Sequence, residues 1–395
     1  MSRLPACEHP LVVSRVAIGI VAAVLAAIAC ASVWGAAQHP VRWTPDALYY
    51  QARMLEIRGT GQQTAVDRTF SGPISADLRA QDPHKTGNPA WVKYNEPFYE
   101  RRVAVPIAAA VLYPIAGNRS LLYISLAGYV AVVLAVFGLL LLRFRLAVAG
   151  AVAAATAVLP PLVKHSSFPL TDSWGLALEI VALAAAFLVL QRGRAWLLPW
   201  IASIALLSFV RDSTWIPILA AAWCAFRFRS RPSVELLATG VAAALPAVFA
   251  FTTPVRDLLA LLVNQSQVPP DTSWSFILHK YPAALVDLAH ADAGFLRRGE
   301  WYTAAYFAAG LAALLLVRSQ RQSDRTWRSL LIPAALASLA YVMAAPVFSA
   351  FRLELVFIPA VAFGLASALE LAAEKVPAGS GARLASLRAP AWIRR

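Results

Sequence analysis

The stretch Trp43-Thr44-Pro45-Asp46-Ala47-Leu48-Tyr49-Tyr50-Gln51-Ala52-Arg53 follows the first long apolar segment of the chain, Val12 to Ala37. Thr44 is a good N-cap and Pro45 a good first helical residue, so a helix is predicted to begin here. Gly59 offers a stop for that helix. A polar helix is therefore expected directly after the chain leaves the first apolar segment.

Four side chains on this predicted helix indicate a candidate site. Asp46 lies in its first turn, and it shares one face with Tyr49 or Tyr50 and with Arg53 through the i, i+3, i+4, i+7 spacing. An acid, a phenol and a guanidinium on one face at a membrane surface are the groups from which a site can form. The alternative is that Asp46 only complements the helix dipole, as first-turn acids often do.

The composition is that of a polytopic membrane protein. Of 395 residues, 59% are hydrophobic and 14% charged, whereas soluble domains carry about 25% charged residues. The net charge of +14 does not indicate nucleic-acid binding, because the basic residues are scattered in small groups between apolar runs, as cytoplasmic loop anchors are. The segment Val12 to Ala37 is longer than the ~7–15 residue core of a signal peptide and is expected to be an uncleaved anchor.

The predicted fold is all-α, with about ten transmembrane helices. A spanning helix needs about 20 mostly apolar residues, and suitable segments recur along the whole chain. They are 13–36, 120–142, 146–163, 173–190, 195–210, 212–226, 234–252, 301–317, 329–347 and 353–373.

The distribution of basic residues indicates whether the short apolar segment 103–116 crosses the membrane. If it crossed the membrane, Arg143 and Arg145 would lie outside and every later loop would invert. As a juxtamembrane helix of the first outer loop, it leaves the basic clusters on one side, which the positive-inside rule favours. Both termini are then cytoplasmic, and the chain forms one membrane-embedded domain, 1–375, with outer loops at about 38–119 and 253–300 and a basic cytoplasmic tail, 376–395.

Each short outer turn contains one isolated basic residue: Lys164, Arg211 and Arg352. Charges at the membrane edge are functional candidates, and lone basic residues there suggest anion binding, for which the planar fork of arginine suits a phosphate better than lysine does. The alternative is a local salt bridge to the acid nearest in sequence. These acids are Asp172, Asp212 and Glu354.

Arg101 and Arg102 close the first outer loop, where they either face the same anion or anchor the chain at the interface. Three cysteines, near the N-terminus or inside apolar runs, predict no disulfide and no metal cluster: Cys7, Cys30 and Cys224. The histidine spacings match no common metal motif, so no metal site is predicted. No phosphate-binding loop or dinucleotide fingerprint is present, so nucleotide-driven chemistry has no support.

With an acid just past the first span, followed by aromatics and a basic residue, the chain resembles the GT-C membrane glycosyltransferases. These include the protein O-mannosyltransferase and aminoarabinose-transferase relatives that use polyprenyl-phosphate sugars. Three further segments are similar to segments of that family: Phe98-Tyr99-Glu100-Arg101-Arg102-Val103-Ala104-Val105-Pro106, Leu170-Thr171-Asp172-Ser173 and Phe351-Arg352-Leu353-Glu354-Leu355-Val356-Phe357-Ile358-Pro359. The chain departs from the family in lacking a second acid beside Asp46 and a soluble domain after the last span.

The resemblance implies an inverting hexosyl- or pentosyltransferase that moves a sugar from a polyprenyl-phosphate carrier to a glycan, lipid or protein acceptor at the outer face of the plasma membrane. It implies that Asp46 is the general base, while Asp172 orients the acceptor or a cation. The side chains expected to bind substrate or phosphate are Tyr49, Tyr50, Arg53, Arg101, Arg102, Lys164, Arg211 and Arg352.

No cofactor is expected to be required, and a divalent cation is left open. The expected partners are the donor, the acceptor and membrane lipid, without nucleic acid. Two alternatives remain: a polysaccharide polymerase or ligase that shares the carrier, and a polyprenyl-lipid transporter or flippase. Charges that cluster at one outer face, with mid-span positions that are nearly all apolar, favour a one-sided enzyme over a transporter.

Overall fold

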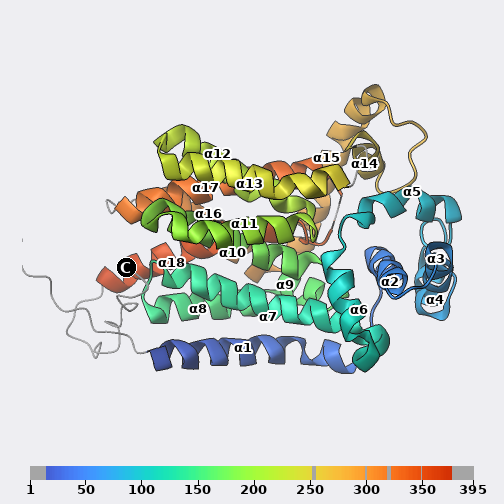
Figure 1. Cartoon of the computed structure of the whole chain (residues 1–395), viewed down its shortest axis with the longest axis horizontal. Coiled ribbons are helices and arrows are strands. Elements are labelled where there is room, and N and C mark those ends of the chain that lie inside the picture. Colours follow the sequence, from blue (N-terminus) through green and yellow to red (C-terminus); the bar gives the residue numbers. More distant parts are fainter. Residues whose placement is uncertain (1–14, 251–254, 299, 318–321, 348, 376–395) are drawn as a thin grey trace, which may run out of the picture.

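The secondary structure of the described part of the chain is entirely helical (Figure 1). The computed structural model describes residues 15–250, 255–298, 300–317, 322–347 and 349–375. Its elements are α1 (Arg15–Gln38), α2 (Pro45–Ile57), α3 (Gln62–Phe70), η1 (Pro73–Ser75), α4 (Ala76–Gln81), α5 (Pro89–Glu100), α6 (Ala104–Ala116), η2 (Gly117–Arg119), α7 (Ser120–Leu141), α8 (Leu146–Ala157), α9 (Pro160–Ser166), α10 (Asp172–Arg192), η3 (Arg194–Trp196), α11 (Leu197–Ser208), η4 (Asp212–Thr214), α12 (Trp215–Phe228), α13 (Arg231–Ala250), α14 (Val255–Val263), α15 (Trp274–Arg297), α16 (Trp301–Leu316), α17 (Gln322–Ala344), η5 (Glu354–Phe357) and α18 (Ile358–Lys375).

Each of the ten apolar segments expected to span a membrane contains helix. Six helices are long and apolar enough to cross, or seven if α8 and α9, which meet at a bend of 59°, form one span. The remaining three, α11, α12 and α16, have 12, 14 and 16 residues. At 1.5 Å per residue these are shorter than the ~30 Å apolar core of a bilayer. The structure thus confirms an all-helical chain with several helices of membrane-spanning length, and the count of ten stays a prediction.

The first loop begins as its capping residues predict. The Thr44 side chain accepts a hydrogen bond from the Ala47 amide at 3.2 Å, and α2 follows from Pro45. At the other end, Gly59 has a left-handed φ of 91°, which glycine adopts without the steric cost of a side chain. The segment 103–116 forms a separate helix, α6, which runs across the end of the bundle rather than along it (Figure 1).

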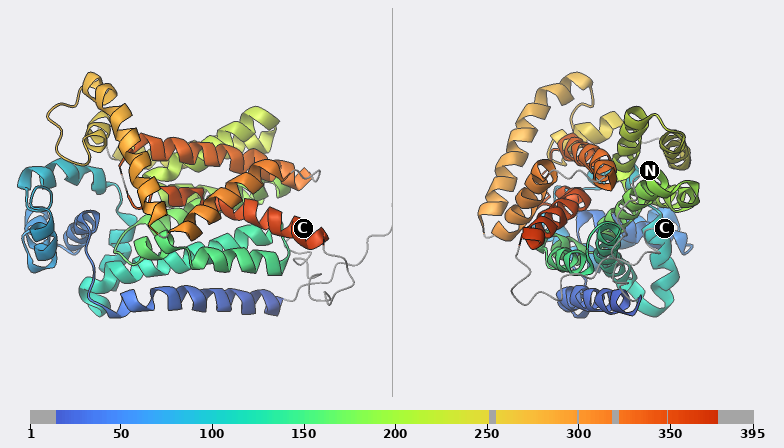
Figure 2. Two further views of the ribbon diagram at one scale, coloured as in Figure 1. Left: turned by 180° about the vertical axis from the view of Figure 1, so that it is seen from behind. Right: turned by 90° about the vertical axis from the view of Figure 1, so that its left-hand side faces the viewer.

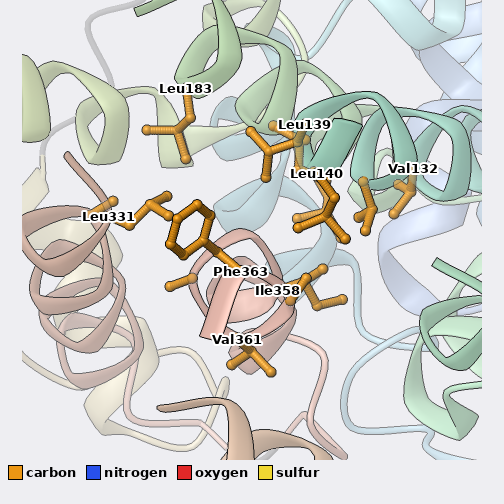
Figure 3. Close-up of a cluster of buried hydrophobic side chains, with 14 of the residues drawn as sticks. Val132, Leu139, Leu140, Leu183, Leu331, Ile358, Val361 and Phe363 are labelled. Carbon is orange, nitrogen blue, oxygen red and sulfur yellow. The ribbon is translucent and has the colours of Figure 1, made fainter. Parts of the chain in front are cut away.

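The bundle is packed around α10, which contacts α7, α11, α13 and α17. Close-packed aliphatic and aromatic side chains from α7, α10, α17 and α18 lie in its core (Figure 3), together with side chains of the surrounding helices. α16 and α18 approach most closely where Gly310 faces Gly364, since a Cβ added at Gly364 would lie 1.9 Å from the Gly310 carbonyl oxygen. Small residues at a helix crossing permit such close backbone contact.

The long helices of the bundle run back and forth along one axis (Figures 1 and 2). Clusters of ion pairs lie at both ends of this bundle. At one end, Arg143 pairs with both Asp324 and Glu370. Gln191 at the end of α10 donates to Thr326 at 2.7 Å, so the loop after α10 lies at this same end. We call it the Arg143 end, and we call the other the Asp46 end. Arg143 and the basic residues beside this loop, Arg192 and Arg194, therefore lie at the same end of the bundle. The sequence predicted that these residues share one side of the membrane.

Fusions of reporter proteins test which end faces the cytoplasm. Because basic residues of short loops favour the cytoplasmic side, fusions after Arg194 and Arg231 are expected to fluoresce as green fluorescent protein and to be inactive as alkaline phosphatase. Fusions near Lys85 and Asp271, in the two long loops, should show the reverse pattern. Equal alkaline phosphatase activity at Arg231 and Lys85 would contradict the predicted topology. The expected cytoplasmic tail and Arg318 and Arg321 lie outside the described residues.

Candidate functional site

A cavity of about 490 Å³ opens at the Asp46 end. Its walls come from segments that are distant in sequence: the first loop, the start of α10, the turn before α12, α14, the end of α17 and the turn before η5. Three aspartates and four arginines line it, namely Asp46, Asp172, Asp212, Arg101, Arg102, Arg211 and Arg352. One positive charge therefore remains when all seven are ionised.

Asp46 projects into this cavity from the first turn of α2. Its Oδ1 accepts a hydrogen bond from the Tyr99 hydroxyl at 2.7 Å, and its Oδ2 accepts one from Arg352 Nη1 at 2.6 Å. Burial by itself would raise the pKa of Asp46, but Arg352, the Tyr99 hydroxyl and Arg102 more than offset this and lower it below its usual value. Asp46 is thus an ionised carboxylate at neutral pH.

Arg352 joins the two acids that sequence reasoning selected. Its Nη1 contacts Asp46, while its Nε donates to Asp172 Oδ1 at 2.9 Å. Arg211 contacts the same Asp172 oxygen and donates from Nε to the Tyr341 hydroxyl at 3.4 Å. The second carboxylate oxygen of Asp172 is buried without a hydrogen-bond partner. Asp172 therefore holds two guanidinium groups side by side.

A second cluster lies beside the first. Asp212 pairs with Arg101 and with Arg102, the latter at 2.5 Å. Burial would raise the pKa of Asp212, but Arg102 and Arg101 lower it below its usual value. Arg102 also donates to the Tyr50 hydroxyl at 3.0 Å, and that hydroxyl lies 3.3 Å from Thr171 Oγ1. These contacts link the first loop to the start of α10.

Aromatic rings fix the position of Tyr99 behind Asp46. The Tyr99 ring stacks on Tyr49, with ring centroids 4.4 Å apart and planes 2° from parallel. The Tyr49 hydroxyl donates to the Val92 carbonyl at 3.1 Å, away from the cavity. Burial, and next the Asp46 charge, raise the pKa of Tyr99 well above its usual value, so this phenol stays protonated and donates to Asp46.

One wall of the cavity is apolar. α14 contributes five side chains to it: Val255, Leu258, Leu259, Leu261 and Leu262. The other side of α14 packs on α15 through Ala260 and Val263. α5 holds this segment in place, because Trp91 Nε1 donates to the Ser266 carbonyl at 2.7 Å and the Tyr94 hydroxyl to the Asp257 carbonyl at 3.1 Å. The cavity is therefore amphipathic, with a cationic floor and an aliphatic wall.

Four of the predicted site residues do not line the cavity: Tyr49, Tyr50, Arg53 and Lys164. The buried Tyr50 lies behind Arg102, which donates to its hydroxyl. Arg53 pairs with Glu56 at 2.6 Å in a separate cleft of the first loop, because seven residues of α2 carry the chain away from the cavity before Arg53 is reached. Lys164 is exposed, and its Nζ lies 5.8 Å from the centre of the Phe295 ring. Tyr49 supports Tyr99 without lining the cavity. Arg53 and Lys164 thus lie outside the group of arginines that lines the cavity.

At Arg211 and Arg352, the arginines pair with more distant acids than the alternative of a local salt bridge predicts. Arg211 pairs with Asp172 rather than with its neighbour Asp212, and Arg352 pairs with Asp46 and Asp172. Glu354 instead faces Asp292 of α15. All these ion pairs connect different elements, which is what a shared site requires.

Sequence reasoning missed three contributors to the site. They are the Tyr99 hydroxyl, the buried His165 and the apolar face of α14, all of which line the cavity. The i, i+3, i+4, i+7 spacing of Val255, Leu258, Leu259 and Leu262 signals an apolar helix face. Among the described residues, no group of three or more His, Cys, Asp or Glu side chains is placed to share a metal ion.

Comparisons with known proteins give no relative: no family model, no curated protein and no solved structure matches this chain.

Proposed function

We propose that this chain is a glycosyltransferase that moves a sugar from a polyprenyl-phosphate carrier to an acceptor hydroxyl at the Asp46 end. One observation supports this above all. Asp46 and Arg352, 306 residues apart in sequence, meet at 2.6 Å in an amphipathic cavity that also holds three further arginines. An ionised acid beside a cationic cluster and an aliphatic wall suits a reaction in which a base acts next to a lipid phosphate.

In the proposed reaction, the acceptor oxygen attacks the anomeric carbon of the donor. Asp46 accepts the hydroxyl proton as the new carbon–oxygen bond forms, and the bond from the anomeric carbon to the phosphate oxygen breaks. The lipid phosphate leaves with the bonding electrons, and the anomeric configuration inverts. A well-placed general base typically contributes about 10²–10⁴ in rate.

The arginines have the complementary role. Guanidinium groups bind phosphate oxygens through paired, charge-assisted hydrogen bonds, and fixed cations stabilise the charge that develops on a leaving group. In the structure, Asp46, Asp172 and Asp212 occupy these donors. A bound phosphate would engage Arg352, Arg211 and Arg102 while Asp172 and Asp212 keep the guanidinium groups in place. The α14 wall would hold the first part of the hydrocarbon chain.

The test is a transfer assay in detergent or lipid vesicles with radiolabelled donors. Purified protein is incubated with a panel of polyprenyl-phosphate sugars and, separately, with nucleotide sugars. Release of polyprenyl monophosphate, with the label in a glycan, lipid or peptide fraction, supports the proposal. Turnover of nucleotide sugars without the lipid donors would contradict it.

The low pKa of Asp46 predicts how the rate depends on pH. Because its carboxylate is stabilised in the folded protein, kcat/KM should stay constant from neutral pH down to about pH 4 and fall only below that value, where Asp46 takes up a proton. The ionised Asp46 carboxylate also contributes to the free energy of unfolding. This contribution is fully present above the usual carboxyl pKa and is lost as the pH falls through the lowered pKa of the folded protein. A bound phosphate would compete for Arg352, so the acid limb of kcat should lie at higher pH than that of kcat/KM. A limb of kcat/KM near pH 6–7 would indicate another base.

A second function, transport of the lipid-linked sugar, is favoured by one residue. Glu179 lies two turns into α10 and is fully buried, with the Ser213 hydroxyl beside its carboxylate. Intramembrane acids of this kind often carry protons or ions in transporters.

Glu179→Gln distinguishes the two functions. For a glycosyltransferase, transfer at the Asp46 end should change by less than about threefold, since the amide is isosteric and Glu179 does not line the cavity. For a proton-coupled transporter, movement of a fluorescent polyprenyl-phosphate sugar across proteoliposomes should stop. Lost translocation with unchanged binding in the variant would favour transport.

A further inference from the structure

The turn that carries Arg352 has an unusual backbone. Ala350 and Phe351, the two residues before it, have φ values of 52° and 65°. These lie in the left-handed region, which is uncommon for residues with a side chain and a genuine outlier for a bulky one. Such conformations persist where the surroundings hold them, and they concentrate at functional sites.

Two sets of contacts hold this turn. The buried ring of Phe351 packs against Phe307 and Phe295, at centroid distances of 5.3 and 6.0 Å. On the other side, His165 Nε2 donates to the Ala350 carbonyl oxygen at 2.9 Å. His165 is itself buried, at the end of α9. The strained peptide thus lies between an aromatic anchor and one side-chain hydrogen bond.

The turn determines where Arg352 points. Its amide donates to the Ser349 carbonyl, and the Leu353 amide donates to Ser349 Oγ at 3.2 Å. Directly after the two left-handed residues, the Arg352 side chain reaches Asp46 and Asp172 together. A relaxed turn would redirect the backbone at residue 352 and separate the guanidinium group from at least one of these acids.

We propose that His165 is a positioning residue: its hydrogen bond to Ala350 holds the strained 349–351 turn, and so presents the Arg352 guanidinium group to an anionic phosphate. The phosphate as ligand rests on the function proposed above, whereas the link between His165 and the turn does not. His165 also lines the cavity, so a direct contact with the ligand is the competing explanation, and the two explanations predict different results.

The experiment compares four variants with the parent protein by two measurements. The first is hydrogen–deuterium exchange of peptides covering residues 349–356, without ligand. The second is the affinity for polyprenyl monophosphate in detergent micelles. The variants are His165→Leu, His165→Gln, Ala350→Gly and the double variant His165→Leu/Ala350→Gly. A further glycine substitution, Arg229→Gly, is the control, because Arg229 also has a left-handed φ, of 50°, but ends α12 far from the cavity.

With His165 in a positioning role, His165→Leu should speed exchange at the Arg352 and Leu353 amides. It should weaken binding by about 10-fold, the low end of the effect measured for residues that orient metal ligands. Ala350→Gly lets the turn adopt its shape without steric cost, which raises the competent population. The double variant should therefore recover most of the lost affinity, while His165→Leu/Arg229→Gly should recover none. Glutamine keeps a donor, so His165→Gln should bind nearly as the parent does. If His165→Leu does not fold, His165→Asn, which is too short to reach the carbonyl, replaces it.

Unchanged exchange and unchanged affinity in His165→Leu would overturn the proposal. Weaker binding with unchanged exchange and no recovery by Ala350→Gly would also overturn it, since His165 would then contact the ligand itself. If the parent does not bind polyprenyl monophosphate but His165→Leu still speeds exchange of the turn, the proposed function fails and the positioning role stands.

Discussion

Asp46→Asn is expected to lower turnover of a polyprenyl-phosphate sugar by about 10²–10⁴. Asparagine keeps the size of the side chain and can still accept from the Tyr99 hydroxyl, but it cannot take up the acceptor proton. Affinity for the carrier should change far less, since the phosphate is expected to bind the arginines. Steady-state kinetics with separate measurement of carrier binding would separate kcat from affinity.

Stability provides the control for this prediction, because the substitution also removes one ion pair with Arg352. Asp324→Asn removes the corresponding pair with Arg143 at the opposite end, so a similar fall in Tm with unchanged turnover is expected there. If Asp46 only complements the helix dipole, its replacement should cost about 1 kcal/mol or less and leave the rate intact. Turnover at the parent rate would end the catalytic assignment and make Asp172 the next acid to test.

Local signals in the sequence predicted the helical fold well. Apolar runs marked all ten segments in which the bundle helices lie, and Thr44, Pro45 and Gly59 marked both ends of α2. These features depend only on residues that are close in sequence, so a single sequence is enough to predict them. Whether α11, α12 and α16 cross a membrane cannot be predicted in this way, because their length alone does not decide it.

The pairing of charges at the site was not predictable in the same way. The sequence predicted an anion site at Arg211 and Arg352, with pairing to the nearest acid as the alternative, yet each arginine pairs with an acid from a distant element. Which acid lies opposite which arginine depends on how α2, α10 and the turn before η5 meet in space. The strained backbone at Ala350 and Phe351 likewise has no local signal, since neither residue favours a left-handed φ. The candidate residues were accessible from the sequence, but their partners required the fold.

Arg352→Ala is expected to lower kcat by about 10²–10³, the effect of removing one preorganised donor from a developing negative charge. It should also weaken binding of polyprenyl monophosphate, and Arg352→Lys should restore only part of both, because a lysine ammonium cannot reproduce the planar fork that spans Asp46 and Asp172. The measurement is kcat and carrier affinity for the three proteins at one ionic strength, since exposed charges are screened by salt.

The matched control is Arg143→Ala. Arg143 and Arg352 are both largely buried, and each contacts two carboxylates that come from other elements of the chain. Both alanine variants leave carboxylates without their guanidinium partner, so both should lower the Tm. The loss in free energy of unfolding should be at most about 3–5 kcal/mol, the cost of removing one partner from a buried ion pair. Only Arg352→Ala should also lower turnover per folded molecule, because only Arg352 lies in the cavity with Asp46. Equal turnover in the two variants, after correction for the folded fraction, would mean that Arg352 stabilises the Asp46 end without acting on the leaving phosphate.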